Sequence, residues 1–423
     1  MASSTSDRFR AMRGRSGEEA GFFWQGGPIT VAERTYFQSR FSGVTGFETD
    51  EGIVLVDSGM AQLGPALAKM LREMTAAPVH TVVITHGHVD HAYGIEAFLA
   101  PGQQRPRIIA HRNMPARFAR YELTSRFNAA INARQFGGSP ERAAQGQEYD
   151  SFRLPSLLPD TLYQEHFAFS VGGVTFEVHH SKGETDDHSW VWCAERGVIA
   201  SGDMIISALP NAGNPQKVQR YPWEWSKGLK TMAALKPRTL CPGHGAPIID
   251  DAEKIQRVLL ETAAFLDEIV DQTLDAMAQS APPHTDIVHM VKQPVSESPW
   301  LQPIYDETEF IVRNIIRFYG GWWNGRPSDL KPAPRNALAC ELARMSGGPR
   351  ALASRATEIA VSGDMRLACH LADYALEAAP ADEEVRETVA TLYESRASVE
   401  RGLMSENLYK SAAVYARAGR PFV

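Results

Sequence analysis

The sequence predicts an α/β domain followed by an all-α region. In the first 260 residues, short apolar and β-branched runs alternate with helical patterns, as expected for strands connected by helices. Four of the predicted strands end in polar loops that contain histidine or carboxylate residues. Beyond Pro334 the chain is rich in alanine and shows helical periodicity.

Size and composition limit the classes of protein to consider. The chain has 423 residues, enough for two or three domains, and its 43% hydrophobic and 22% charged residues are ordinary for a globular protein. A net charge of −7 without a long basic run argues against nucleic acid or an anionic membrane as the partner. The four cysteines are scattered, residues 1–24 form an expected mobile segment without a secretory signal, and no apolar run could span a membrane. These features favour a cytoplasmic protein with reduced thiols.

The amino-terminal half opens with a β-α-β pattern. Residues 29–47 read as short strands, residues 52–59 as a buried strand ending in a turn, and residues 61–75 as an amphipathic helix that leads to a strand at 79–84. Asp57 stands at the end of the first buried strand. It could cap a loop or helix, or it could accept a hydrogen bond that orients a metal-binding side chain.

The motif Thr85-His86-Gly87-His88-Val89-Asp90-His91 follows the second buried strand, where open α/β sheets build their sites. His86 and His88, two residues apart in an extended segment, can hold one cation. Asp90 and His91, turning into the next helix, can face a second, and both residue types suit zinc and its neighbours. The alternative is a set of solvated loop histidines.

Residues 107–111 read as a further strand, after which the pattern changes. The stretch 112–159 is polar and rich in arginine, and we interpret it as a helical insertion near the site. Its arginines could form a lid that presents guanidinium groups to an anion, or simply a solvated helix face.

Strand patterns return at 174–179, 190–194, 198–200 and 238–240. The loops that follow them carry Glu184, Asp203 and His244 as potential metal ligands. His179, His180 and His188 lie near the same loop as Glu184 and compete with it for that role.

The rest of the chain is predicted to be helical. A long helix at 251–279 precedes a proline-rich connection and a helix at 309–319, and the tail shows helical segments at 335–345, 350–361, 365–378 and 383–401. We place a domain boundary after residue 260, so that residues 261–423 form either a dimerisation module or a buttress.

The motifs resemble those of the metallo-β-lactamase superfamily over about residues 25–260. They are, in order, His86-Gly87-His88-Val89-Asp90-His91, Gly202-Asp203 and Gly243-His244-Gly245. The resemblance implies a four-layer αβ/βα sandwich with two metals at one edge. It further implies that Asp203 bridges both metals, that His244 completes the second, and that Asp90 has a catalytic as well as a metal-binding role.

One departure points to a branch of this superfamily. Where members usually have Gly-His-Thr, this chain has Gly183-Glu184-Thr185, which is similar to the alkylsulfatase branch, where a glutamate binds the first metal. Residues 132–137 agree with that branch, and residues 321–327 look like the start of its helical dimerisation domain, implying a homodimer. The bridging Gly202-Asp203 follows the general superfamily instead. The proton-donating histidine of the branch is replaced here by the neighbourhood Thr308-Glu309-Phe310-Ile311.

The charges of the predicted site indicate its chemistry. Two divalent cations bring +4, and Asp90, Glu184 and Asp203 bring −3, so the cluster can activate a bridging hydroxide but attracts an anion only weakly. Lys217 and Arg220 are candidates to clamp an anionic substrate, unless they are ordinary surface cations. We therefore expect a two-metal hydrolase, with zinc as the first choice of metal, that acts on a small-molecule alkyl or related sulfate ester. The alternatives are a carboxylic ester, lactone or β-lactam hydrolase, and a non-catalytic metal-stabilised binding or assembly protein.

Overall fold

The computed structural model describes residues 21–136 and 154–420. Most of the expected mobile segment 1–24 therefore lies outside the described residues. The same holds for residues 137–153 of the predicted insertion 112–159. Within the described residues the chain forms two compact units. One comprises 21–125, 154–280 and 286–320, and the other comprises 126–136, 281–285 and 321–420.

The first unit contains a mixed sheet of seven strands in sequential order. Its first four strands pair antiparallel, and the pairs from β4 to β7 are parallel. Helix α2, Gly64–Met74, connects β4 to β5, so the predicted β-α-β unit is present. The strands are β1 Gly26–Ala32, β2 Thr35–Arg40, β3 Ser42–Thr49, β4 Gly52–Val56, β5 Val79–Val83, β6 Arg107–His111 and β7 Thr161–Tyr163.

A second sheet of five strands has the order β12-β11-β10-β9-β8. Only the pair β11–β12 is parallel, and helix α7, Pro222–Ala234, connects these two strands. The strands are β8 His166–Val171, β9 Val174–His180, β10 Ser189–Cys193, β11 Val198–Gly202 and β12 Thr239–Pro242. Sequence analysis had predicted four of them and missed the edge strand β8.

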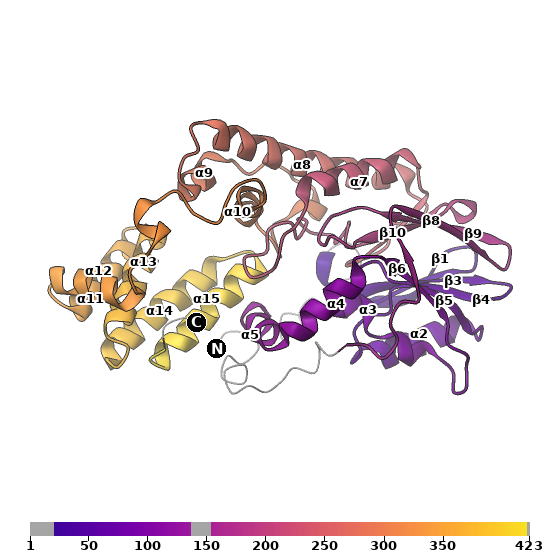
Figure 1. The fold of residues 1–423 in the computed structure, drawn as a ribbon, viewed down its shortest axis with the longest axis horizontal. Helices are drawn as coiled ribbons and strands as arrows, with labels where there is room; N and C mark the ends of the chain where they lie inside the picture. Colours follow the sequence, from indigo (N-terminus) through magenta and orange to yellow (C-terminus); the bar gives the residue numbers. More distant parts are fainter. Residues whose placement is uncertain (1–20, 137–153, 421–423) are drawn as a thin grey trace. The chain divides into compact units, whose positions relative to one another are not determined.

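Alternating side chains bury both faces of each sheet. Leu55 of β4 packs in one core with Leu67 of α2, whereas its neighbour Val56 faces the second sheet in another core. In β10, Val191 belongs to the core between the sheets and Trp190 to a third core with α7 and α8, Ala252–Ala278. Because successive residues of a strand point to opposite faces, each sheet separates two cores. The predicted four-layer αβ/βα sandwich is confirmed, with α2 on one outside and α7 and α8 on the other (Figure 1).

Helices form much of the described part of the predicted insertion, and two further helices follow α8. Helices α3 Val89–Ala92, α4 Met114–Leu123 and α5 Ser125–Gln135 follow β5 and β6, and α9 His284–Met290 and α10 Thr308–Tyr319 follow α8. The expected division after residue 260 falls inside α8, which is continuous there and contributes Leu259 and Ala263 to the core. The compact units instead divide the chain close to Gly320.

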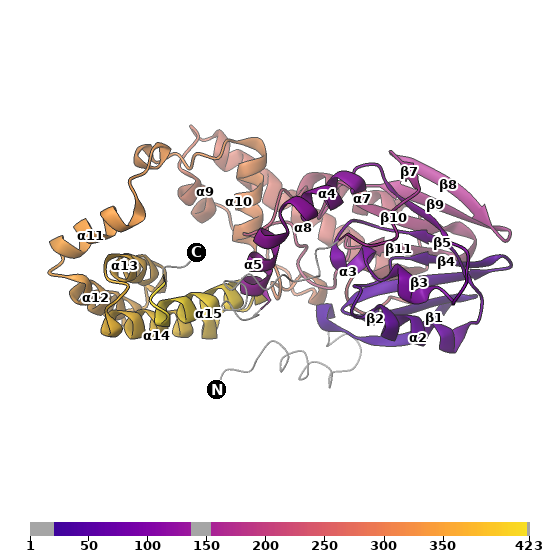
Figure 2. The same cartoon turned by 60° about the horizontal axis from the view of Figure 1, so that its bottom comes forward.

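From Arg335 to Arg417 the tail consists of helices joined by short turns (Figure 2). The predicted segments are present, and a further helix, α15, follows them. Alanines such as Ala368, Ala372 and Ala375 let the helices approach closely, which explains the alanine-rich sequence. The helices are α11 Arg335–Met345, α12 Pro349–Val361, α13 Met365–Ala378, α14 Glu383–Val399 and α15 Leu403–Arg417. Across the described residues, every helix is too short or too polar to cross a membrane.

Candidate metal centre

Loops at the ends of several strands bring the predicted ligands together. The motif 85–91 follows β5, the loop 181–188 connects β9 to β10, Asp203 directly follows β11, and His244 lies two residues after β12. Two groups of side chains result, each with its donor atoms within 4.8 Å of one another. They contain every metal ligand predicted from the sequence.

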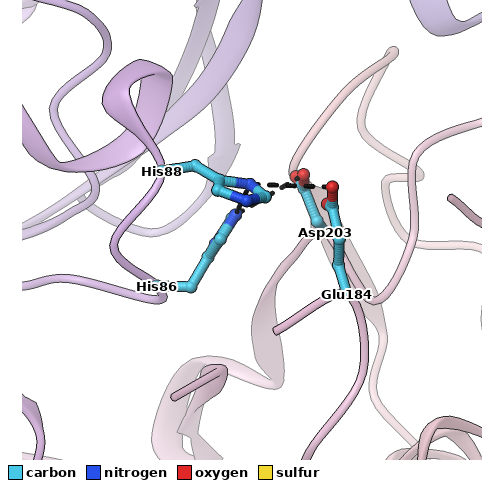
Figure 3. A group of neighbouring side chains, drawn as sticks. All are labelled: His86, His88, Glu184 and Asp203. Atoms are coloured by element: carbon cyan, nitrogen blue, oxygen red, sulfur yellow. Dashed lines mark hydrogen bonds and ion pairs between the residues drawn. The ribbon is translucent and has the colours of Figure 1, made fainter. Parts of the chain in front are cut away.

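The first group consists of His86, His88, Glu184 and Asp203. His86 Nε2 lies 2.9 Å from His88 Nδ1 and 3.7 Å from Asp203 Oδ2, and His88 Nδ1 lies 3.6 Å from Glu184 Oε1. Figure 3 shows the two imidazoles facing the two carboxylates across a small gap. The glutamate therefore lies in the position predicted for it, beside two imidazoles.

The second group consists of Asp90, His91 and His244. His91 Nε2 and His244 Nε2 each lie 3.5 Å from Asp90 Oδ2. Asp203 also reaches this group, because its Oδ1 lies 3.1 Å from His91 Nε2 and 3.5 Å from His244 Nε2. The two oxygens of Asp203 thus face different groups.

The donor atoms fit divalent cations. Donors bound at about 2.0–2.1 Å around a tetrahedral zinc lie about 3.3 Å apart, close to the separations in both groups. Glu184 Oε2 is buried and makes no hydrogen bond, and His91 Nε2 and Asp203 Oδ1 are buried and face each other at 3.1 Å. Since a buried polar atom without a partner is costly, a cation bound there would satisfy atoms that the protein leaves unpaired.

The electrostatics agree with this fit. Burial and the nearby Asp203 raise the pKa of Glu184 well above its usual value. Burial has the same tendency at Asp203, but His91 and His244 outweigh it and hold the pKa of Asp203 well below its usual value. Such a concentration of buried carboxylates and imidazoles is what a bound cation relieves.

Asp57 orients two imidazoles of the centre, one directly and one through Thr85. Its Oδ1 accepts a hydrogen bond from Thr85 N, and its Oδ2 accepts from Thr85 Oγ1 and from His91 Nδ1, each at 2.8 Å. When Nδ1 of His91 donates this bond to Asp57, a cation can take the place of a proton at Nε2. Thr85 Oγ1 donates to Asp57 and can therefore accept from His86 Nδ1 at 3.0 Å. This hydrogen bond orients the His86 ring so that Nε2 faces the centre. Sequence analysis had singled out Asp57 but not Thr85.

Backbone groups fix the remaining orientations. His244 Nδ1 donates to the carbonyl oxygen of Phe41 at 2.8 Å, so its Nε2 is free to bind a cation. His188 Nε2 accepts from Asp203 N at 3.0 Å, and burial lowers the pKa of His188 to about 4. The His188 imidazole is therefore neutral, and it positions Asp203 by accepting this hydrogen bond. Neither of the other two competing histidines is a member of the two groups: His180 donates from Nδ1 to the His188 carbonyl, and His179 lies outside them.

The predicted anion-binding residues differ in their surroundings. Arg220 is buried, and its Nη2 lies 3.3 Å from Glu184 Oε1, so it is not an ordinary surface cation. Asn211, which sequence analysis missed, donates from Nδ2 to the same oxygen. Burial and the nearby Arg220 lower the pKa of Lys217 to about 7. Both predicted cations thus lie in the electrostatic environment of the centre.

Arg117 of the predicted lid has a different role. It is buried, and its Nε donates to Asp187 Oδ1 at 2.6 Å. Asp187 also accepts from the backbone of Gly87 at 2.9 Å. Nε and Nη2 of this guanidinium pair with Asp187 and Asp186, so these two atoms support the motif 85–91 rather than an anion.

Comparison with known proteins agrees with the fold. Residues 42–244 match the family model described as metallo-beta-lactamase superfamily, and residues 284–419 match the model described as alkyl sulfatase dimerisation. Residues 42–244 therefore form a metallo-β-lactamase domain, and the chain is an enzyme with this hydrolase fold. Its second matched region makes it alkylsulfatase-like.

Several curated proteins are similar over most of the chain. A linear primary-alkylsulfatase of Pseudomonas sp. is 24% identical, covering 87% of this chain and 72% of its own. An alkyl/aryl-sulfatase of Saccharomyces cerevisiae is 21% identical, covering 90% and 62%, and an (R)-specific secondary-alkylsulfatase of Pseudomonas sp. is 22% identical, covering 90% and 60%. This chain thus spans about 60% of the length of two of these relatives.

A solved structure shows the same fold. The stereoselective inverting sec-alkylsulfatase from Pseudomonas sp. superposes with a TM-score of 0.83 at 18% identity, covering 98% of this chain and 70% of its own. Its likeness therefore extends through both the sandwich and the helical tail.

Proposed function

We propose that this chain is a two-metal hydrolase of alkyl or related sulfate esters. The proposal rests on the position of the Asp203 carboxylate. Its Oδ2 lies near His86 in the first group, and its Oδ1 lies near His91 and His244 in the second. A carboxylate in this position can bridge two cations. The sulfate ester is suggested by the printed names of the relatives and by the matched dimerisation region.

Two divalent cations bound to these groups would polarise the ester and activate a bridging water as the hydroxide that attacks it. Around them, His86, His88 and Glu184 would hold the first cation, Asp90, His91 and His244 the second, and Asp203 both. The Asp90 side chain is 14% exposed, whereas that of Asp203 is 5% exposed.

Lys217 and Arg220 would receive the anionic end of the substrate. Since Arg220 donates from Nη1 to the Val218 carbonyl and pairs with Glu184 through Nη2, it is held in a fixed orientation. Its buried Nε makes no hydrogen bond and remains available to an anion. Lys217 adds a second positive charge whenever it is protonated.

The remaining parts of the proposal follow from the same assignments. Zinc is the metal that we expect, since mixed imidazole and carboxylate donors suit it. We propose that the region 284–419 acts in forming a homodimer, as suggested by the description of the family model matched there. A cytoplasmic location fits the four free cysteines.

The test combines metal analysis with a substrate panel. Purified protein should contain two metals in the two donor groups and release sulfate from an alkyl sulfate. If the protein only opens a lactone or β-lactam ring, or only cleaves a carboxylic ester, the two-metal centre stands but the sulfate-ester substrate is refuted. Absence of metal from both groups after incubation with zinc would refute the two-metal proposal itself and favour a non-catalytic protein.

Matched lysine variants test the anion site. Lys217→Met should raise KM for an alkyl sulfate by about 10-fold or more, because a charge-assisted hydrogen bond is lost. Its activity on a neutral ester should change little. Lys69→Met removes an exposed charge from α2 and is the control. Equal KM values for the three proteins would exclude Lys217 from substrate binding.

A further inference from the structure

A third group of metal-binding side chains lies on the hairpin formed by β8 and β9. His166 of β8 is directly opposite His179 of β9, and Glu177 lies two residues before His179 on the same face. His166 Nε2 is 3.2 Å and His179 Nε2 is 3.5 Å from Glu177 Oε2. The three donor atoms lie within 4.8 Å of one another. None of these residues belongs to the two groups described above.

Ring stacking holds the His179 side chain of this group in place without a bound ion. The His179 ring stacks on Trp190 of β10, with ring centroids 4.2 Å apart and planes inclined by 9°. This contact aims Nε2 of His179 at Glu177. That nitrogen is buried, and its 3.5 Å contact with Glu177 Oε2 is too poorly aligned to be a hydrogen bond.

Protonation does not block the imidazole of His179. Burial, together with the nearby His166, lowers its pKa below the ordinary value. The neutral ring therefore has a lone pair to offer at neutral pH. His166 is 48% exposed, which leaves one side of the group open to a water ligand and to an entering cation.

We propose that His166, Glu177 and His179 form a third cation site, separate from the two-metal centre, for zinc or a neighbouring transition-metal ion. The 3.2 and 3.5 Å separations are close to the spacing of about 3.3 Å between donors on a tetrahedral zinc. Two imidazoles and one carboxylate suit such an ion and do not suit magnesium or calcium, which prefer oxygen donors.

The position of the site suggests what the ion does. β8 is the terminal strand of the second sheet, and it pairs there with β9 alone. An ion shared by His166, Glu177 and His179 would join the edge strand to its neighbour through side chains as well as through the backbone. It therefore stabilises the hairpin, because a ligand that binds only the folded state raises its stability.

Metal counting in single variants tests the proposal. Zinc is added in steps to the full-length protein, and the number bound per chain is measured by calorimetry and by elemental analysis after removal of free metal. The unchanged chain should bind three zinc ions, and His166→Gln and His179→Gln should each bind two. His289→Gln, which removes an exposed imidazole from α9, should still bind three.

The melting temperature provides a second readout. Zinc added beyond two equivalents should raise Tm in the unchanged chain and in His289→Gln, but not in His166→Gln. Equal binding numbers and equal Tm shifts in all four proteins would overturn the site. The variant His244→Ala distinguishes failure of this proposal from failure of the two-metal function. It should lose one ion from the two-metal centre and still bind the ion that requires His166.

Discussion

Replacing Asp57 by asparagine tests how the protein prepares its imidazoles for metal. Asp57 has a φ of +60°, a conformation that asparagine also adopts readily, so Asp57→Asn should fold. The amide oxygen can still accept from Thr85 N. The amide nitrogen, however, would replace Oδ2, which now accepts from His91 Nδ1 and Thr85 Oγ1. To avoid two donors facing each other, His91 must move its proton to Nε2, where it blocks the lone pair intended for the cation.

The size of the effect follows from the contacts that are lost. Changing a group that orients a metal-binding histidine typically costs 10–100-fold in metal affinity, or about 1.4–2.7 kcal/mol. Because Asp57 also acts on His86 through Thr85, we expect this loss at both donor groups. Thr85→Val is a matched variant, since it removes the link to His86 while leaving the His91 bond to Asp57. It should weaken the first group only.

Competition with a chelator of known affinity measures both binding constants in the unchanged chain and the two variants. Far-ultraviolet circular dichroism checks that each variant is folded. If Asp57→Asn binds both metals as tightly as the unchanged chain does, the carboxylate does not set the tautomer of His91. Equal losses at both groups in Thr85→Val would refute the separate route to His86.

Three further predictions concern the ligands, the response to acid and the tail. Glu184→Ala should lose the first metal and His244→Ala the second, as measured by elemental analysis; full metal content in both would refute the assignment. His111 stacks on His180 at 3.8 Å, and burial, followed by the charge of His180, lowers the pKa of His111 from 6.5 to about 4. The unfolded chain therefore takes up the proton first, so the free energy of unfolding should fall as pH drops from 6.5 towards 4. His111→Phe should reduce that fall by up to about 3 kcal/mol in urea denaturation, and an unchanged pH dependence would contradict this. Truncation near residue 335 should give a monomer by light scattering, whereas an unchanged assembly would assign the tail another role.

Regular elements were predictable where local patterns are strong. The strand 107–111 and the helices 335–345 and 365–378 have the predicted bounds. The last of them begins after Asp364, whose side chain caps it by accepting from Leu367 N. β8 was missed because only Phe169 and Val171 of its residues are buried, as expected at the edge of a sheet. α15 was missed as well, although it buries residues such as Glu406 and Asn407. Polar residues in buried positions hide the periodicity on which such a prediction depends.

The sequence by itself determined which side chains gather at the centre. Imidazole and carboxylate are characteristic metal donors, and His86, His88, Asp90 and His91 lie in one short segment, so this motif is visible without coordinates. Only the tertiary structure decided how Asp203 divides its oxygens between the groups, and that Arg117 is paired with Asp187. It alone also placed His166 opposite His179. These arrangements depend on strand register and on side-chain direction between segments far apart in the chain, and periodicity along the sequence carries information about neither.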